Sequence, residues 1–249
     1  MNAMEAIKRR ISVRAYEDRP LSDADYADLE AYIAQLNAES GLHFQLYGPR
    51  EGGAPAVKMS ATMFAGSVHC YAALVAPDDA RSGEMLGYYG EKLILHATSL
   101  GVGSCWVAST YDREDARAEI AAGERLWDIV PLGYAARKVP LKQRGIRAAL
   151  RSHDKQPHEL VACDCAFGEL PEGVRAGIDA VIAGPSAING QPVVFAWDGS
   201  SVSADLPDFK RDVQYNDLGI AKLHFQIAAA ECGVAGEWEW GRGGRFILH

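Results

Sequence analysis

The chain has 249 residues, of which 48% are hydrophobic, so it can bury a large core as one domain or as two small ones. Its net charge of −8 and its pI near 5.4 argue against nucleic acid or an anionic membrane as the main partner. The sequence shows no apolar run long enough to span a bilayer, no hydrophobic region of a signal peptide and no disulfide-scaffold rhythm among its cysteines. We therefore expect a cytoplasmic protein.

The first informative stretch is basic. Arg10, Ser12 and Arg14 place two guanidinium groups and a hydroxyl within a short length of chain. This set suits a phosphate group, because guanidinium groups bind phosphate oxygens through paired, charge-assisted hydrogen bonds. Taken alone, the stretch is equally typical of a solvated basic patch.

The first half of the chain carries clear helix and strand patterns. Ser22 is a candidate N-cap with Asp25 three residues later, which predicts the start of a helix. A Gly- and Pro-rich loop occupies residues 48–55. Strand patterns cover residues 42–47, 70–76 and 129–135, and a strongly apolar helix pattern covers residues 86–100.

The second half repeats this order. After a connector at residues 137–165 with helical periodicity, a helix pattern covers 174–182, a strand pattern 193–197 and a buried helix pattern 218–232. Short matches align in sequence, namely Tyr32-Ile33-Ala34 with Val181-Ile182-Ala183 and Lys92-Leu93 with Lys222-Leu223. We therefore predict two repeats, residues 1–150 and 151–249, produced by internal duplication.

The junction between helix and strand in the second repeat is unusually polar. Residues 185–192 read Pro-Ser-Ala-Ile-Asn-Gly-Gln-Pro. The side chains of Ser186, Asn189 and Gln191 supply donors and acceptors that suit the edge of a flat heterocycle, although the stretch alone is also typical of a helix C-terminal turn. Together with the basic stretch, it looks like the second of two ends that hold one flavin mononucleotide (FMN).

These stretches resemble the nitroreductase family. The resemblance rests on Arg10-Ile11-Ser12-Val13-Arg14, on Gly87-Tyr88-Tyr89-Gly90-Glu91-Lys92-Leu93 leading to Leu100-Gly101-Val102-Gly103-Ser104-Cys105-Trp106, on Leu132-Gly133-Tyr134-Ala135 followed by Lys142 and Arg144, and on the polar stretch at 185–192. In ordinary members the Pro-Ser-x-x-Asn segment follows soon after Arg-x-Ser-x-Arg, whereas here it comes about 170 residues later. This order is similar to that of the fused, double-length branch of the family.

The resemblance implies an α+β fold of the nitroreductase type, internally duplicated, with sheet-and-helix halves related by a pseudo-twofold axis. Ordinary members are homodimers with flavins at the interface, so a duplicated chain implies a monomer that rebuilds the dimer within itself. The first repeat has Leu36, Asn37 and Ser40 where the second has its polar set, and the second repeat lacks the Arg-x-Ser-x-Arg stretch. We therefore expect one FMN per chain.

The resemblance also implies which residues hold the flavin. The phosphate would be bound by Arg10, Ser12, Arg14, Lys142 and Arg144, the last two being otherwise part of a solvated connector. The isoalloxazine or ribityl edge would be bound by Pro185, Ser186, Ala187, Asn189 and Gln191. Backbone N–H groups of Trp106, Val107 and Ala108 would lie near the flavin N5, although this loop is also typical of a helix C-terminal turn.

The implied activity passes a hydride or two electrons from NADH or NADPH to a nitroaromatic, a quinone or a similar small acceptor, with no catalytic side chain required. The alternatives are another flavin reaction, such as dehydrogenation or dehalogenation, and a flavin-binding or sensing protein with little turnover. No Gly-x-Gly-x-x-Gly fingerprint favours one dinucleotide. Cys163 and Cys165 are too close for a zinc knuckle and lack a cluster of His partners, so we predict no metal site.

Overall fold

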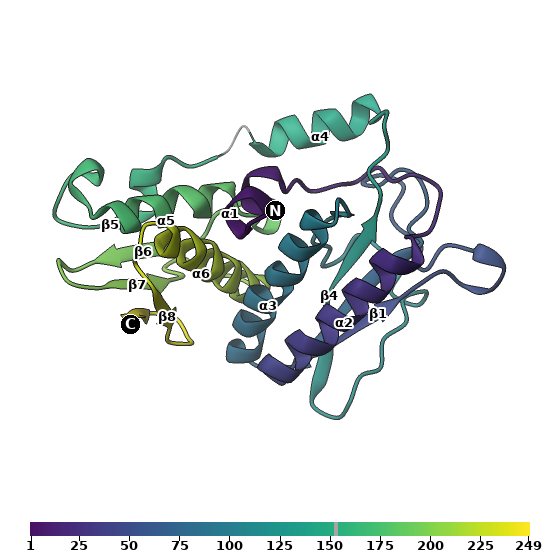
Figure 1. Ribbon diagram of the computed structural model, residues 1–249, viewed down its shortest axis with the longest axis horizontal. Helices are drawn as coiled ribbons and strands as arrows, with labels where there is room; N and C mark the ends of the chain where they lie inside the picture. The colour runs from purple at the N-terminus through teal and green to yellow at the C-terminus, as the bar shows by residue number, and fades with distance from the viewer. Residues whose placement is uncertain (152–153) are drawn as a thin grey trace. The chain divides into compact units, whose positions relative to one another are not determined.

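The computed structural model describes residues 1–151 and 154–249 (Figure 1). The chain forms two compact units. Unit one consists of residues 9–78 and 92–149 together with Met1, and unit two consists of residues 2–8, 79–91 and 150–249. One border of the units lies between residues 149 and 150, one residue before the predicted division, and two segments of the first half, 2–8 and 79–91, belong to unit two.

Unit one is built on a four-stranded sheet in the order β1-β2-β4-β3, with all neighbouring strands antiparallel. Its strands are β1 (His43–Tyr47), β2 (Cys70–Pro77), β3 (Gly103–Ser104) and β4 (Glu124–Gly133). Helix α2 (Asp23–Ser40) begins at the predicted N-cap, where the Ser22 side chain accepts a hydrogen bond from the backbone N–H of Asp25. Strand β2 is buried along its length except at Pro77, which explains its continuous apolar sequence.

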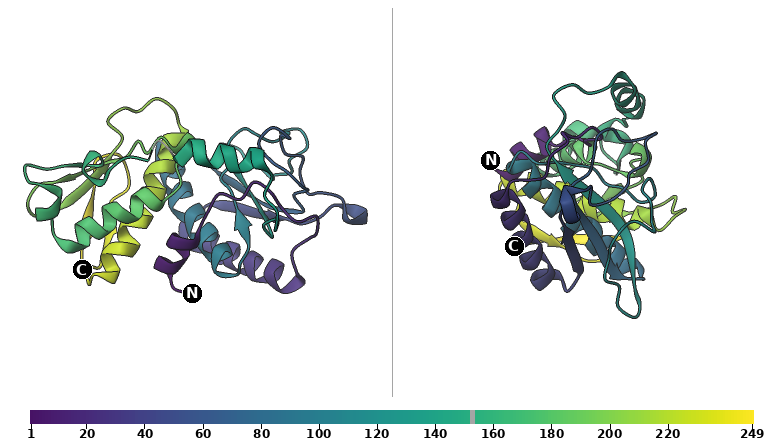
Figure 2. Two further views of the ribbon diagram at one scale, coloured as in Figure 1. Left: turned by 90° about the horizontal axis from the view of Figure 1, so that it is seen from above. Right: turned by 90° about the vertical axis from the view of Figure 1, so that its right-hand side faces the viewer.

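Unit two is built on a five-stranded sheet in the order β5-β6-β7-β9-β8. Its strands are β5 (Val161–Ala162), β6 (Val194–Trp197), β7 (Val202–Asp205), β8 (Gly236–Trp238) and β9 (Gly244–Leu248). Helices α5 (Glu172–Ala183) and α6 (Val213–Glu231) pack side by side, as the left view of Figure 2 shows. The core between helices and sheet is mostly aliphatic and contains a cluster of four aromatic residues, in which the rings of Phe195 and Phe225 are stacked at 5.2 Å.

The internal duplication is visible in the topology. Each repeat runs helix, strand, strand, helix, strand, strand, as α2-β1-β2-α3-β3-β4 and as α5-β6-β7-α6-β8-β9, where α3 is Ala80–Ser99. The sheet order β1-β2-β4-β3 is reproduced as β6-β7-β9-β8, with the same antiparallel pairings. The duplicated α+β architecture is therefore confirmed, and β5 is an addition that pairs in parallel with β6. The pseudo-twofold axis stays a prediction.

The first part of α3 and helix α6 cross at very short range inside unit two. A Cβ atom on Gly87 would lie 2.1 Å from the carbonyl oxygen of Asn216, and one on Gly219 would lie 1.9 Å from the carbonyl oxygen of Glu84. Both clashes are with backbone, which cannot move aside as a flexible side chain can. The two glycines therefore permit this helix crossing.

The predicted elements differ from the observed ones mainly at their ends. Helices predicted at 86–100 and 218–232 begin earlier, at Ala80 and Val213, because their first turns carry polar residues without an apolar stripe. The connector periodicity is confirmed as α4 (Leu141–Arg151), and a short helix α1 (Ala3–Arg9) precedes the basic stretch. Within the described residues, no helix is long and apolar enough to cross a membrane.

Candidate functional site

The basic stretch lies directly beside strand β3 in unit one. Ser12 pairs in parallel with Ser104, and the N–H of Val13 donates to the carbonyl oxygen of Ser104 over 2.8 Å. A Cβ atom on Gly103 would come within 2.7 Å of the Val13 side chain, so this approach requires glycine. The fold thus joins two stretches of the predicted site, the basic stretch and the loop at residues 103–109.

A cavity of about 250 Å³ opens along the basic stretch. It is lined by Ile11, Ser12, Val13, Arg14, Ala15, Ala135, Val139, Gln143 and Arg144. Three of the five residues predicted to bind phosphate therefore share one cavity, Ser12, Arg14 and Arg144. Lys142 is exposed and does not line the cavity, and Arg10 does not line it either.

Gln143 is a site residue that the sequence analysis missed. Its side chain is 7% exposed, and its Oε1 atom has no hydrogen-bond partner among the described residues. A buried polar atom without a partner costs roughly 1–3 kcal/mol, so it is typical of a place where a ligand supplies the missing partner. No local pattern marks this residue, because it stands between two basic residues, Lys142 and Arg144, in a run that is ordinarily exposed to solvent.

Cys105 lies beside the cavity, and its pKa shows which basic residues are near it. Burial raises the pKa of its thiol, while the charges of Arg14 and Arg10 and a hydrogen bond with Ser12 lower it in part. Arg10 is therefore close to this cluster although it does not line the cavity. The thiol stays protonated and packed, as expected for a cysteine without an adjacent His or Lys.

The loop after β3 places its three predicted residues differently. Trp106 and Ala108 are half-buried, whereas the side chain of Val107 is buried in the core of unit one. The N–H of Val107 donates to the carbonyl oxygen of Ile129 over 3.0 Å, and Ile129 returns the bond. Val107 therefore offers neither its N–H nor its side chain to a ligand, and the contacts of Trp106 and Ala108 with a flavin stay predictions.

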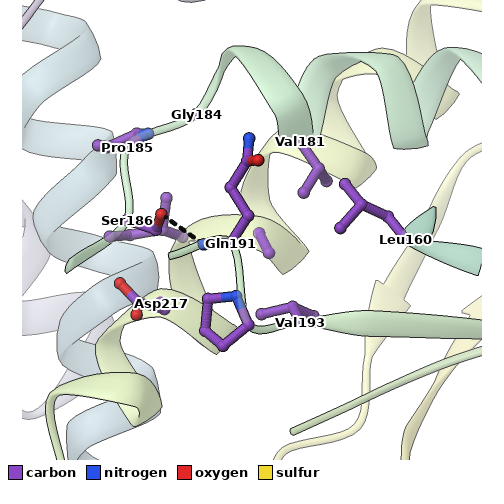
Figure 3. A pocket seen from close by; sticks show the side chains of 11 residues that line it. Leu160, Val181, Gly184, Pro185, Ser186, Gln191, Val193 and Asp217 are labelled. Carbon is purple, nitrogen blue, oxygen red and sulfur yellow. Dashed lines mark hydrogen bonds between the residues drawn. The ribbon is translucent and has the colours of Figure 1, made fainter. Parts of the chain in front are cut away.

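The polar stretch at 185–192 forms a strained turn in unit two (Figure 3). Three non-glycine residues have positive φ, with Ile188 at 50°, Asn189 at 57° and Gln191 at 42°. Each such residue costs on the order of 1–3 kcal/mol and persists only where surrounding contacts enforce it. Ile188 is β-branched and 73% exposed, so no burial of its side chain offsets the strain.

Hydrogen bonds from within unit two hold this turn. The N–H of Ala187 donates to Asp217 Oδ1 over 2.9 Å, and the N–H of Gln191 donates to Ser186 Oγ over 2.9 Å, the contact dashed in Figure 3. Asn189 Nδ2 donates to the carbonyl oxygen of Leu150 and to Asp154 Oδ1, over 2.8 and 2.7 Å.

The amide of Gln191 is likewise engaged. Its Oε1 accepts the N–H of Lys155 over 2.7 Å, and its backbone carbonyl accepts Lys155 Nζ over 2.8 Å. In this structure the amides predicted to bind a flavin edge instead fasten the connector that follows α4. The sequence could not indicate these contacts, because their partners lie more than 30 residues away in a segment without a recognisable motif.

Asp217 is a second residue that the sequence analysis missed. It lies within the apolar helix α6, is 4% exposed, and lines a cavity of about 20 Å³ with Ser186 and Gln191. Such a cavity holds about one water molecule, so it is not a flavin pocket. Burial raises the pKa of Asp217 to about 7, although the N–H of Ala187 and the charge of Arg211 act in the opposite direction.

Two further buried pairs of polar side chains link α3 and α6 within unit two. Lys222 Nζ donates to Glu84 Oε1 over 2.5 Å, and His224 Nε2 lies 3.0 Å from Glu91 Oε1. Their polar atoms are satisfied by protein groups, so we assign them to structure. Across the described residues, no group of three or more His, Cys, Asp or Glu side chains is placed to hold a metal ion.

Comparison with solved structures finds nitroreductases. A putative nitroreductase from Thermotoga maritima shares 22% identity over 100% of this chain and 93% of its own, with a TM-score of 0.66, which shows the fold. A nitroreductase with bound FMN from Bacteroides fragilis is 21% identical over 57% of this chain and 92% of its own, with a TM-score of 0.43. A nitroreductase family protein from Clostridium difficile is 18% identical over 67% of this chain and 100% of its own, with a TM-score of 0.47.

No curated protein matches the chain. The family described as putative TM nitroreductase matches residues 2–229, which is nearly the whole sequence and includes the basic stretch, helix α3, the strained turn and most of helix α6. The predicted resemblance is thus confirmed. The chain belongs to the putative TM nitroreductase family.

Proposed function

We propose that the protein is an FMN-dependent oxidoreductase that passes a hydride or two electrons from NADH or NADPH to a nitroaromatic, a quinone or a similar acceptor. The observation that carries this proposal is the cavity of unit one, where Ser12, Arg14 and Arg144 line the same space as Gln143, whose buried Oε1 lacks a partner among the described residues. Membership in the nitroreductase family supports the same interpretation.

The chemistry of the cavity fits the phosphate end of FMN. Two guanidinium groups and a hydroxyl provide donors for phosphate oxygens. Gln143 Oε1 is an acceptor, so it does not bind an anion and suits a ligand group with a donor, such as a hydroxyl. An anion beside hydroxyl groups is what a phosphorylated polyol presents, and the ribityl phosphate of FMN is such a group.

The residues of this chain would bind and orient the cofactor. Arg14 and Arg144 would neutralise the phosphate charge, Ser12 would donate to a phosphate oxygen, and Gln143 would accept from a ribityl hydroxyl. When bound, FMN supplies the hydride and electron transfer, so the proposal requires no side-chain acid or base. We keep the predicted contribution of Ser186 and Asn189 as part of the proposal, to be tested by substitution.

A pair of neighbouring residues on α4 gives a matched test. Arg144→Ala removes a guanidinium group that lines the cavity, whereas Lys142→Ala removes a charge on the same helix that does not. We expect the first to weaken FMN binding by roughly 10- to 100-fold and the second to leave it nearly unchanged, as measured by flavin fluorescence quenching. Equal effects of the two variants would show that only overall charge matters.

Turnover is measured separately from binding. The FMN-loaded protein is mixed with NADH or NADPH and either a quinone or a nitroaromatic acceptor, and oxidation of the dinucleotide is followed by absorbance. We expect oxidation that depends on both FMN and the acceptor. Stoichiometric FMN binding without oxidation would favour the alternative of a flavin-binding protein with little turnover.

A further inference from the structure

Two cysteines of unit two form a pair of neighbouring thiols. Cys163 and Cys165 are both half-buried, and the chain bends at Asp164 and Cys165. Cys163 Sγ donates to the carbonyl oxygen of Cys165 over 2.9 Å, and the two thiols are hydrogen-bonded to each other. The bend thus brings two sulfur atoms into contact, at a position that the proposed flavin chemistry does not use.

The other cysteines of the chain are not arranged in this way. Cys70 and Cys105 are 1% and 3% exposed, and burial raises the pKa of both thiols, that of Cys70 to about 12. Cys232 is exposed at the end of α6. Chemistry that needs two adjacent, accessible thiols is therefore confined to the pair at 163 and 165.

We propose that Cys163 and Cys165 are a reversible redox dithiol, which a small disulfide such as oxidised glutathione converts into an intramolecular disulfide bond. Consecutive Cα atoms are about 3.8 Å apart, so the bend brings the Cα atoms of these residues towards the roughly 4.4–6.8 Å that a disulfide bond requires. The pair directly follows β5, an edge strand, and both side chains stay partly exposed while packing against the core of unit two.

The reaction proceeds in two exchange steps. A hydrogen bond with Cys163 raises the pKa of Cys165, and burial and the charges of Glu169 and Asp164 raise it further. Cys165 therefore keeps its proton, and Cys163 attacks first. The Cys163 sulfur bonds to one sulfur of oxidised glutathione, the S–S bond breaks, and one glutathione leaves with a proton. The Cys165 sulfur then bonds to Cys163 and releases the second glutathione with the second proton. The protein loses two electrons and two protons, and one oxidised glutathione becomes two reduced ones.

The disulfide bond is expected to be readily reversible. The disulfide bond closes a loop of only three residues, so it restricts the unfolded chain little. It therefore adds little to the stability of the folded chain. Disulfide bonds that are accessible and strained are the more easily reduced kind. The dithiol would therefore respond to the ratio of oxidised to reduced glutathione rather than remain permanently oxidised.

Mass spectrometry of the full chain tests this proposal. The reduced protein is equilibrated with mixtures of oxidised and reduced glutathione, quenched in acid, alkylated and digested with trypsin, which leaves both thiols on one peptide between Lys155 and Arg175. We expect this peptide to lose two hydrogens and both alkylation sites as the mixture becomes oxidising, and to regain them when it becomes reducing. Only mixed glutathione adducts, only intermolecular disulfides, or no oxidation while Cys232 reacts would each overturn the proposal.

Single substitutions resolve the order of the steps. Cys165→Ser removes the second thiol, so we expect the reaction to stop with one glutathione on Cys163. Cys163→Ser leaves the thiol that holds its proton, so we expect adduct formation to be several-fold slower. Cys232→Ser is the matched control and should form the intramolecular disulfide like the parent chain. Equal adduct rates for the first two variants would overturn the assignment of Cys163 as the attacking thiol.

Discussion

Asp217→Asn removes a charge that unit two buries against the strained turn. In the folded chain the pKa of Asp217 is raised by burial from its ordinary value of 3.8 to about 7. Below both values the carboxyl is protonated in the folded and unfolded chain alike, so it costs nothing. As pH rises between them, the unfolded chain releases a proton that the folded chain retains, and stability falls by about 1.4 kcal/mol per pH unit. Above pH 7 the accumulated cost is about 4 kcal/mol.

Urea unfolding of the two proteins measures this cost. The amide introduced by Asp217→Asn retains an oxygen that accepts the N–H of Ala187 but does not ionise, so the variant should escape the penalty. We expect the stability difference between variant and parent to grow by roughly 2.5 kcal/mol between about pH 5 and pH 8. Asp208→Asn, at an exposed position of the same unit, is the control and should show no such trend. Parallel pH curves for the parent and the Asp217 variant would refute the reasoning.

Three further predictions concern the flavin, the fold and the assembly. Arg14→Ala should weaken FMN binding by about 1.5–3 kcal/mol and riboflavin binding much less, because riboflavin has no phosphate; equal losses in the two titrations would make Arg14 structural. Gly219→Ala should destabilise the chain by about 1–3 kcal/mol in thermal unfolding, since its Cβ atom would overlap backbone of α3, whereas Gly168→Ala has open space and should be neutral. Sedimentation should find a monomer, because the chain carries both copies of the repeat, and a tight dimer would contradict this.

Individual helices and strands were predictable from the sequence where a local signal marks them, and contacts between distant segments were not. The helix that starts after Ser22 and the strand at residues 70–76 follow from a cap and from a continuous apolar run, both local signals. The strands β7, β8 and β9 were missed because they contain residues that are rare in strands: β7 ends at Asp205, and β8 and β9 begin at Gly236 and Gly244.

In the candidate site, too, local signals were predictable and the effects of burial were not. The phosphate set could be predicted because Arg10, Ser12 and Arg14 alternate along one short segment, and Ser12 and Arg14 line the cavity of unit one. Gln143 and Asp217 were missed because their importance arises from burial, which is a property of the folded unit and not of their neighbours in sequence.

The two repeats differ most at the connection between their first helix and first strand. In the first repeat α2 ends at Ser40 and β1 begins at His43, and the 2 intervening residues include Gly41 at φ 72°, an ordinary helix cap. In the second repeat α5 ends at Ala183 and β6 begins at Val194, and the 10 intervening residues contain all three non-glycine positive-φ residues found in the described chain.

This difference between the repeats predicts how many FMN molecules one chain binds. In the first repeat, the side chain of Asn37 on α2 is bonded to the backbone of Phe44 on β1. It donates to the carbonyl oxygen of Phe44 and accepts its N–H, over 2.8 Å in each case. Among the described residues, only the second repeat has an expanded, strained turn, and only the first has the basic stretch with its cavity. Strain of this kind is costly and persists where it serves a function. We therefore expect FMN titration to saturate at one equivalent per chain, whereas saturation at two equivalents would show that each repeat keeps a complete site.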